Sequence, residues 1–335
     1  MIACGAPADC QDESWQIAET TMDRALKCFC CLMITEFGDH HLNRSPTLLE
    51  KNRMLQKNAS RGFPGCFASW DCKHFVWNKC PIALQGQHKG HADGGKHTKT
   101  LEAIADDSCH VWFTNFGDPG SLNDINVLDK SSIVGALISG QLDLKTDPCV
   151  INGTTRDWMS FLVDGVHPEW EIFVKTTPRS CQRNQHDKRH SEAQEAFRKD
   201  IERAFGILMK KFLMLAQPIC CWHEATTKNL LCTCAILHNM VVEERVKELG
   251  NANLSEEDHA RCSETSDARN KALDQNRIFS KLPAAGNDDN LENQMAQRLA
   301  RATSLHHLML DHNLHLQLKK DLCNDMIDRS HKKKS

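Results

Sequence analysis

The stretch "SFLVDGVHPEW" (residues 160–170) joins an apolar run directly to a carboxylate and a turn. The run at 160–163 indicates an inner strand, because short apolar runs bounded by turn residues are typical of buried strands. It ends on Asp164, and the chain then turns through Gly165 and Pro168. Asn or Ser would serve an ordinary strand end equally well, so the aspartate suggests a function.

A similar arrangement occurs earlier, in "CFASWDCKHF" (66–75), where Asp71 follows an apolar run. We predict a strand over 66–72, with Asp71 just after its apolar part. Two further strands, over 99–107 and 109–117, are rich in β-branched and aromatic residues. Only a tight polar turn separates this pair, so we expect a hairpin.

Helical periodicity indicates helices on both sides of these strands. The segment 191–217 has apolar residues three or four positions apart, which is typical of an amphipathic helix. The other expected helices cover 14–37, 46–58, part of 118–140, where Asp124 is a candidate cap, and 224–248. Strands followed by helices in this order indicate an α/β fold, a mixed sheet flanked by helices with a helical N-terminal segment.

Composition sets broad limits on the function. The chain has 335 residues, of which 40% are hydrophobic and 25% charged, with a net charge of −3. These values are typical of a soluble globular protein, and we expect no membrane association, because no apolar run approaches the roughly 20 residues of a spanning helix. The 17 cysteines show no paired CxxC spacing, so buried reduced thiols are favoured over zinc ligands.

Beyond about residue 250 the sequence changes character. A polar stretch with few large apolar residues indicates a linker, and a weak helical pattern follows over 291–322. The end, "RSHKKKS" (329–335), is a basic tail. It is either a DNA contact or nuclear address, or a solvated terminus.

Three acids stand out against this background: Asp71, Asp164 and Glu202, the last beside apolar Ile201 on the helix predicted over 191–217. Carboxylate oxygens suit hard divalent ions such as Mg²⁺, and such ions would relieve the repulsion between converging acids. Two bound ions would support phosphoryl transfer. On spacing alone, the alternative is two turn residues and a surface acid.

Several longer motifs resemble one family in the right order. They are "GFPGCFASWDCKHFVWNKCPIALQGQ", "LEAIADDSCHVWFTNFGDPGSLNDINVLDKS", "FLVDGVHPEW" with "FVKT", "RKDIERAFGILMKKF" and "AILHNMVVEE". Together they resemble the catalytic domain of PIF/Harbinger transposases, the plant-transposon branch of the DDE superfamily. The resemblance covers about residues 1–245, and it implies an RNase H-like fold with a DDE nuclease site.

By position, the resemblance implies that Asp71 and Asp164 are the catalytic aspartates and Glu202 the catalytic glutamate. All three would bind two Mg²⁺ or Mn²⁺ ions. Asp124 matches a recurrent family aspartate, which is a helix cap, a group behind the ligands or a direct ligand.

Two more residues are candidates for supporting roles. Arg203 either orients Glu202 or contacts phosphate. His238 lies in the family's "LHNM" block, where helix packing near the site is the default and a direct role the alternative.

The resemblance also implies a domain organisation. Residues 1–60 would be a helical segment, the truncated remnant of a helix-turn-helix-like DNA-binding region. Residues 61–247 would be the RNase H-like DDE catalytic domain, and 248–335 the polar linker, weak helix and basic tail.

The implied function is metal-dependent hydrolysis and strand transfer of DNA phosphodiester bonds in the nucleus. The implied partners are transposon-end and target DNA, a Myb/SANT-like protein and a second copy of the chain. The sequence also departs from the family, because it has no tyrosine, and Phe161 and His167 stand where aromatic hydroxyls are expected. The alternative is therefore a catalytically inactive, transposase-derived nuclear DNA-binding or adaptor protein.

Overall fold

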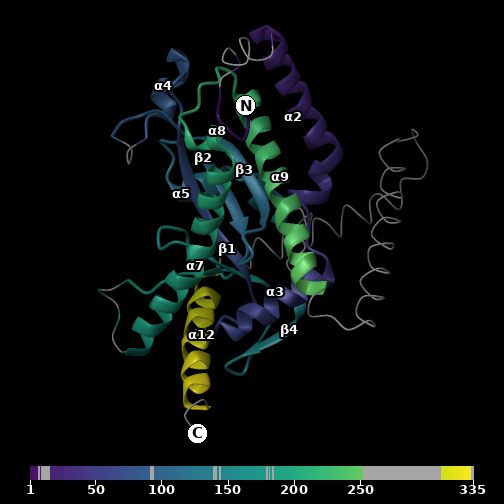
Figure 1. Ribbon diagram of the computed structural model, residues 1–335. Coiled ribbons are helices and arrows are strands. Elements are labelled where there is room, and N and C mark those ends of the chain that lie inside the picture. Colours follow the sequence, from purple (N-terminus) through teal and green to yellow (C-terminus); the bar gives the residue numbers. More distant parts are fainter. Residues whose placement is uncertain are drawn as a thin grey trace, which may run out of the picture.

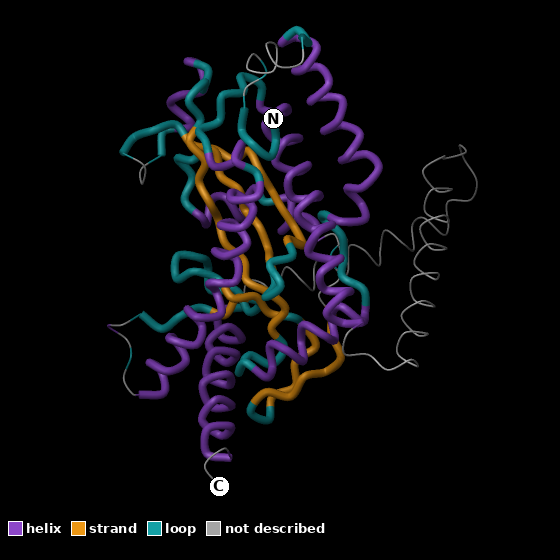
Figure 2. Tube along the Cα trace, in the orientation of Figure 1, coloured by secondary structure: helices purple, strands orange, loops and turns teal. Residues whose placement is uncertain are grey.

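The computed structural model describes residues 1–6, 8, 16–90, 94–138, 142, 145–178, 180, 182, 185–251 and 311–332. A mixed sheet lies at its centre and helices pack on both of its faces (Figures 1 and 2). The predicted linker and the first part of the weak helix, residues 252–310, lie outside the described residues. Within the described part of the chain, no helix combines the length and apolar composition needed to cross a membrane.

The central sheet has five strands in the order β3-β2-β1-β6-β7. Strand β2 pairs antiparallel with both β1 and β3, whereas β6 is parallel to β1 and β7 is parallel to β6. This order and these directions confirm the predicted RNase H-like mixed sheet. The strands are β1 (Cys66–Val76), β2 (Thr98–Ala105), β3 (Val111–Pro119), β6 (Ser160–Leu162) and β7 (Phe173–Val174).

Alternating side chains of the strands form a separate core on each face of the sheet. On one face, Leu101 and Ala103 pack in a cluster with residues of α2 (Glu19–His41), α7 (Gln185–Lys211) and α9 (Glu224–Asn251). On the other face, Trp70 and Ile104 pack with α3 (Leu48–Ser60), α5 (Asp124–Lys130) and α6 (Ser132–Ile138). The helices therefore enclose the sheet on both sides, and the predicted hairpin β2–β3 forms one edge of the sheet.

The expected helix in 118–140 is two helices, α5 and α6. Ser131 has an extended backbone, with φ −63° and ψ 125°, which ends α5. Its hydroxyl then accepts the backbone N–H groups of Ile133 and Val134 and so caps α6. The cap of α5 is Asn123, whose side chain accepts the Asn126 N–H at 2.9 Å. Asp124 is the first helical residue, so its prediction as the cap is wrong by one position.

The structure also contains elements that were not predicted. A separate two-stranded hairpin lies between the two halves of the sheet in the sequence, and short helices follow β1 and α7. The helix predicted over 191–217 is interrupted because Phe212 leaves the helical conformation, with φ −123° and ψ 87°. These elements are β4 (Lys145–Ile151), β5 (Thr154–Trp158), α4 (Ile82–His88) and α8 (Leu213–Ala216).

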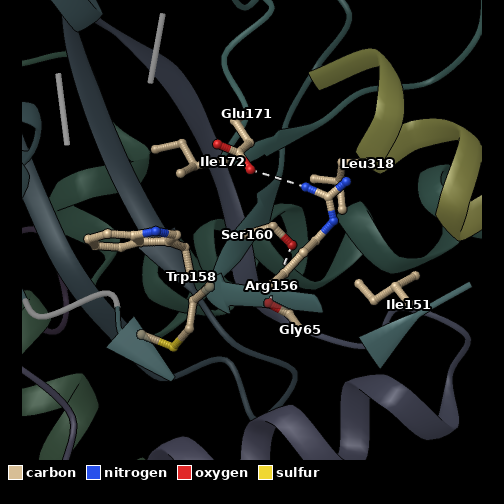
Figure 3. A pocket seen from close by; sticks show the side chains of 9 residues that line it. Gly65, Ile151, Arg156, Trp158, Ser160, Glu171, Ile172 and Leu318 are labelled. Carbon is tan, nitrogen blue, oxygen red and sulfur yellow. Dashed lines mark hydrogen bonds and ion pairs between the residues drawn. The ribbon is translucent and has the colours of Figure 1, made fainter. Parts of the chain in front are cut away.

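The C-terminal helix α12 (His312–Lys332) packs against the β7 side of the sheet and against α7. Leu318 and Leu322 are buried with Val174 in a third core cluster. Figure 3 shows Arg156 of β5 reaching Glu171 beside Leu318. The other end of that guanidinium is 3.2 Å from Asp321 of α12, and the Asp321 side chain is fully buried.

We expect Asp321→Ala to destabilise the fold by about 3 kcal/mol, because removing one member of a buried ion pair leaves Arg156 with only part of its counter-charge. Chemical unfolding of the purified protein measures this loss. Asp328→Ala, an exposed position on the same helix, is the matched control. Equal stability of the two variants would contradict the proposed anchoring.

A second buried acid lies inside the sheet, on β2. Glu102 is fully buried and accepts a hydrogen bond from the Trp70 indole N–H at 3.0 Å. Burial raises the pKa of the Glu102 carboxyl to about 7, although hydrogen bonds oppose the shift. Glu102 therefore stays protonated in the folded chain at pH values where an unfolded glutamate, with a pKa of about 4.3, is ionised.

This difference makes Glu102 a source of pH-dependent stability. Between about pH 4.3 and 7 the unfolded state releases the proton first, so the free energy of unfolding falls as pH rises. We expect Glu102→Gln to remove this loss and to be more stable than the unchanged protein by about 3 to 4 kcal/mol at pH 8. Near pH 4 the two proteins should unfold alike. A denaturant series at both pH values tests this, and a variant that is less stable at pH 8 refutes it.

Candidate functional site

Asp71 lies in the middle of β1, which extends beyond the end predicted at residue 72. The strand continues to Val76 because its second half keeps pairing with β2 as far as Thr98. Asp71 pairs with Ala103, so both side chains are on the sheet face that α7 covers. The small Ala103 side chain leaves room for a carboxylate between β1 and α7.

Asp164 follows the neighbouring strand β6, and continuing the strand register past its last pair would put Asp164 at the level of Asp71. β6 runs parallel to β1, with Ser69 opposite Leu162. Asp71 lies two residues after Ser69, and Asp164 lies two residues after Leu162. Neighbouring strands are about 4.8 Å apart. Asp164 follows the end of β6, where its carboxylate accepts the Gly165 N–H. The predicted position of Asp164 at a strand tip is confirmed.

Helix α7 crosses these strands and is fastened to their ends by Gln194. The Gln194 side-chain amide is fully buried and donates to the carbonyls of Val163 and Val174, each at 2.9 Å. These carbonyls lie at the ends of β6 and β7. Gln194 therefore fixes the first turns of α7 next to the peptide bond that begins Asp164.

Arg198 and Glu202 follow Gln194 at intervals of four residues, so all three share one face of α7. The Arg198 guanidinium contacts Asp71 Oδ2 through Nη1 at 2.7 Å and Glu202 Oε1 through Nη2 at 3.0 Å. The Glu202 side chain is half exposed, at 50%, whereas that of Asp71 is 15% exposed. The structure thus brings Asp71 and Glu202 to one guanidinium, beside the strand that leads to Asp164.

The donor chemistry of this cluster fits hard divalent ions, because all three acids offer carboxylate oxygens. A positive group already lies between two of them, which shows that Asp71 and Glu202 can share a cation. In the described part of the chain, no three His, Cys, Asp or Glu side chains are gathered closely enough to form a ready metal site. A metal site built on Asp71, Asp164 and Glu202 would therefore require these side chains to come closer together and Arg198 to move away.

Arg203 is directed away from Glu202. It pairs with Asp200, one turn earlier on α7, and its Nη2 is 3.4 Å from the Asp107 carbonyl. Asp200 also binds Arg61 at 2.5 Å and is almost fully buried, at 4% exposure. Arg203 therefore helps to fasten α7 to the turn between β2 and β3, and Arg198 is the arginine that contacts Glu202.

His238 belongs to the helix packing behind the site. Its Nε2 donates to the Cys109 carbonyl at 2.7 Å, and Lys211 lies 3.4 Å from Nδ1. Burial lowers the pKa of His238 to about 4, which outweighs the opposing effect of that hydrogen bond. The imidazole is therefore neutral near pH 7, and its contacts are those of the default prediction, helix packing.

Two residues of the site were missed in the sequence. Gln194 and Arg198 precede Glu202 by eight and four residues in the sequence, which is about two turns and one turn of a helix. The helix period places these residues on one stripe with Glu202. The helical spacing of these three residues could be read from the sequence, but the groups of the sheet that they contact could not.

We expect Gln194→Leu to destabilise the protein by about 2 kcal/mol, because the buried carbonyls of Val163 and Val174 lose their shared donor. Thermal or urea unfolding measures the change. Glu195→Leu places the same apolar side chain one position further along, where the residue is exposed, and should be nearly neutral. If both variants unfold alike, Gln194 does not anchor α7.

Comparisons with known proteins agree with this architecture. A family model described as "plant transposon protein" matches residues 40–248. "Protein ALP1-like" from Arabidopsis thaliana is 25% identical over 248 residues, which is 73% of this chain and 56% of that protein. The chain thus spans little more than half the length of this relative. No solved structure matches the chain.

The family match covers more than half of the chain and includes Asp71, Asp164 and Glu202. It also includes all five strands of the central sheet. The order of the motifs, the sheet topology and this match lead to one conclusion: the chain belongs to the plant transposon protein family, a family of Harbinger transposase-derived nucleases.

Proposed function

We propose that this chain is a metal-dependent nuclease that cuts DNA phosphodiester bonds, as a Harbinger-type transposase does. The observation that carries the proposal is the shared cation contact of Asp71 and Glu202 beside the strand that delivers Asp164. These acids come from two strands and one helix that are far apart in the sequence. The contact of Asp71 and Glu202 through Arg198, with Asp164 just after the neighbouring strand, supports a chemical role.

Different residues would bind the ions and position the carboxylates in such a site. Asp71, Asp164 and Glu202 would hold two Mg²⁺ or Mn²⁺ ions, which would activate a water or a 3′-hydroxyl and stabilise the leaving oxygen. Gln194 and the parallel pairing of β1 with β6 would hold the backbone that carries these carboxylates. The half-exposed Glu202 side chain and exposed Gly165 leave this edge open to a nucleic-acid backbone.

The wider reaction follows from the family. Transposon ends and target DNA are the proposed substrates, and strand transfer after cleavage is the proposed sequence of steps. We place this activity in the nucleus, with a Myb/SANT-like protein and a second copy of the chain as proposed partners. The support for these partners is the family membership.

A second candidate function is a non-catalytic DNA-binding or adaptor protein. One specific observation favours it: Arg198 already satisfies Asp71 and Glu202 without any metal ion. A chain that had lost its chemistry would keep this ion-pair network for stability alone. The two candidates differ in metal dependence, because an adaptor binds DNA equally well in EDTA and never cuts it.

Nicking of supercoiled plasmid DNA and of DNA carrying the element's terminal sequences tests the proposal. We expect cleavage with Mg²⁺ or Mn²⁺ and none with EDTA. Asp71→Asn, Asp164→Asn and Glu202→Gln should each lower the rate by at least about 100-fold, more than the loss of an outer-shell partner usually costs.

The matched control is Glu195→Gln, an exposed acid on the same helix, which should cut at the normal rate. Cleavage that survives any one of the three substitutions would refute the assigned site. DNA binding without cleavage, with or without metal, would favour the adaptor.

A further inference from the structure

Arg198 is a positive charge built into the carboxylate site. Its guanidinium is a planar fork, and each terminal nitrogen is directed at a different acid, Asp71 on the sheet and Glu202 on its own helix. Such charge-assisted hydrogen bonds are short and directional. The guanidinium thus occupies the region between two groups that, under the proposed function, bind divalent ions.

We propose that Arg198 is an exchangeable internal counter-ion, which holds Asp71 and Glu202 in place until divalent ions displace it. This inference rests on the proposed metal site and adds a positioning residue to it. In the metal-free chain, the arginine keeps the two carboxylates close despite their mutual repulsion. Divalent ions then bind by displacing the Arg198 guanidinium rather than by entering an empty site.

The two kinds of cation compete for the same oxygens. Mg²⁺ binds carboxylate oxygen at about 2.0 to 2.1 Å and demands near-octahedral geometry. Asp71 Oδ2 and Glu202 Oε1 are already engaged by guanidinium nitrogens at 2.7 and 3.0 Å. The other oxygen of Asp71 accepts the Cys72 N–H at 2.8 Å. An ion that bridges Asp71 and Glu202 therefore replaces the arginine, which also repels it.

Arg198 is also placed so that it can leave. Its side chain is 22% exposed and lies at the partly open rim near Glu202. Other arginines of the fold pair with more deeply buried acids: Arg61 pairs with almost fully buried Asp200 and lies over the Phe197 ring at 3.7 Å. Arg156 pairs with fully buried Asp321. Rotation of Arg198 toward solvent breaks contacts with partly exposed groups only.

The exchange also favours divalent ions over monovalent ions. Two carboxylates and one guanidinium leave a single net negative charge in this part of the site. A monovalent ion gains little by replacing the arginine, whereas a divalent ion gains roughly twice the Coulomb attraction at the same distance. Arg198 thus favours divalent ions over the more abundant monovalent ones, and it does so before DNA is present.

Calorimetric titration of the full chain with Mn²⁺, without DNA, tests the inference. We expect Arg198→Ala to bind Mn²⁺ about tenfold more tightly than the unchanged protein, because it lacks both the competitor and its repulsion. Arg198→Lys keeps the charge and should restore most of the competition. Lys199→Ala removes the same charge from the next, exposed position and should leave the Mn²⁺ affinity unchanged.

The outcomes separate the inference from the function on which it rests. If neither the unchanged protein nor Arg198→Ala binds Mn²⁺, or if Asp71→Asn binds it normally, the metal site itself is refuted. If Asp71→Asn abolishes binding but Arg198→Ala binds with equal or weaker affinity, the metal site stands and the exchange is refuted. Should Arg198→Ala fail to fold, Arg198→Gln, which keeps hydrogen-bond donors without charge, is judged by the same criterion.

Discussion

The parallel pairing of β1 with β6 is the constraint on which the site depends. It sets Ser69 opposite Leu162, each two residues before an acid, Asp71 and Asp164, although 92 residues lie between these two acids in the sequence. A slip of one residue would turn the side chains of one strand to the opposite face. The register is held by apolar residues on both faces, including Trp70, Phe161 and Leu162, each of which is almost fully buried.

Helix α7 brings the third acid, Glu202, to this part of the sheet. One stripe of the helix carries Gln194, Arg198 and Glu202 toward the strand ends and Asp71. Another position, Asp200, binds arginines that tie the helix to the rest of the domain. Different side chains of α7 thus attach the helix to the fold and form the ion-pair contacts with Asp71. This separation lets the partly exposed groups rearrange without loosening the core.

Most of the sheet could be predicted from the sequence, because β1, β2, β3 and β6 are rich in apolar and aromatic residues between clear turns. The β4–β5 hairpin could not, since "KTDPCVI" contains Asp and Pro, which are poor strand formers. Strand β7 is only two residues long and exists through its neighbours. The acids Asp71, Asp164 and Glu202 came from motifs, whereas Arg198 depends on a tertiary contact that no local pattern reports.

Helix α12 protects an edge of the sheet. Within the described residues, β7 is the last strand in the order, so one of its sides has no strand partner there. His315 contacts the Trp170 carbonyl at 3.0 Å, and Lys319 donates to the Thr176 carbonyl at 3.3 Å, so the helix satisfies backbone groups at both ends of β7. Open strand edges template pairing between molecules. The family match ends at residue 248, so a fragment cut to that boundary would bare this edge and be prone to aggregate, whatever the state of its carboxylates.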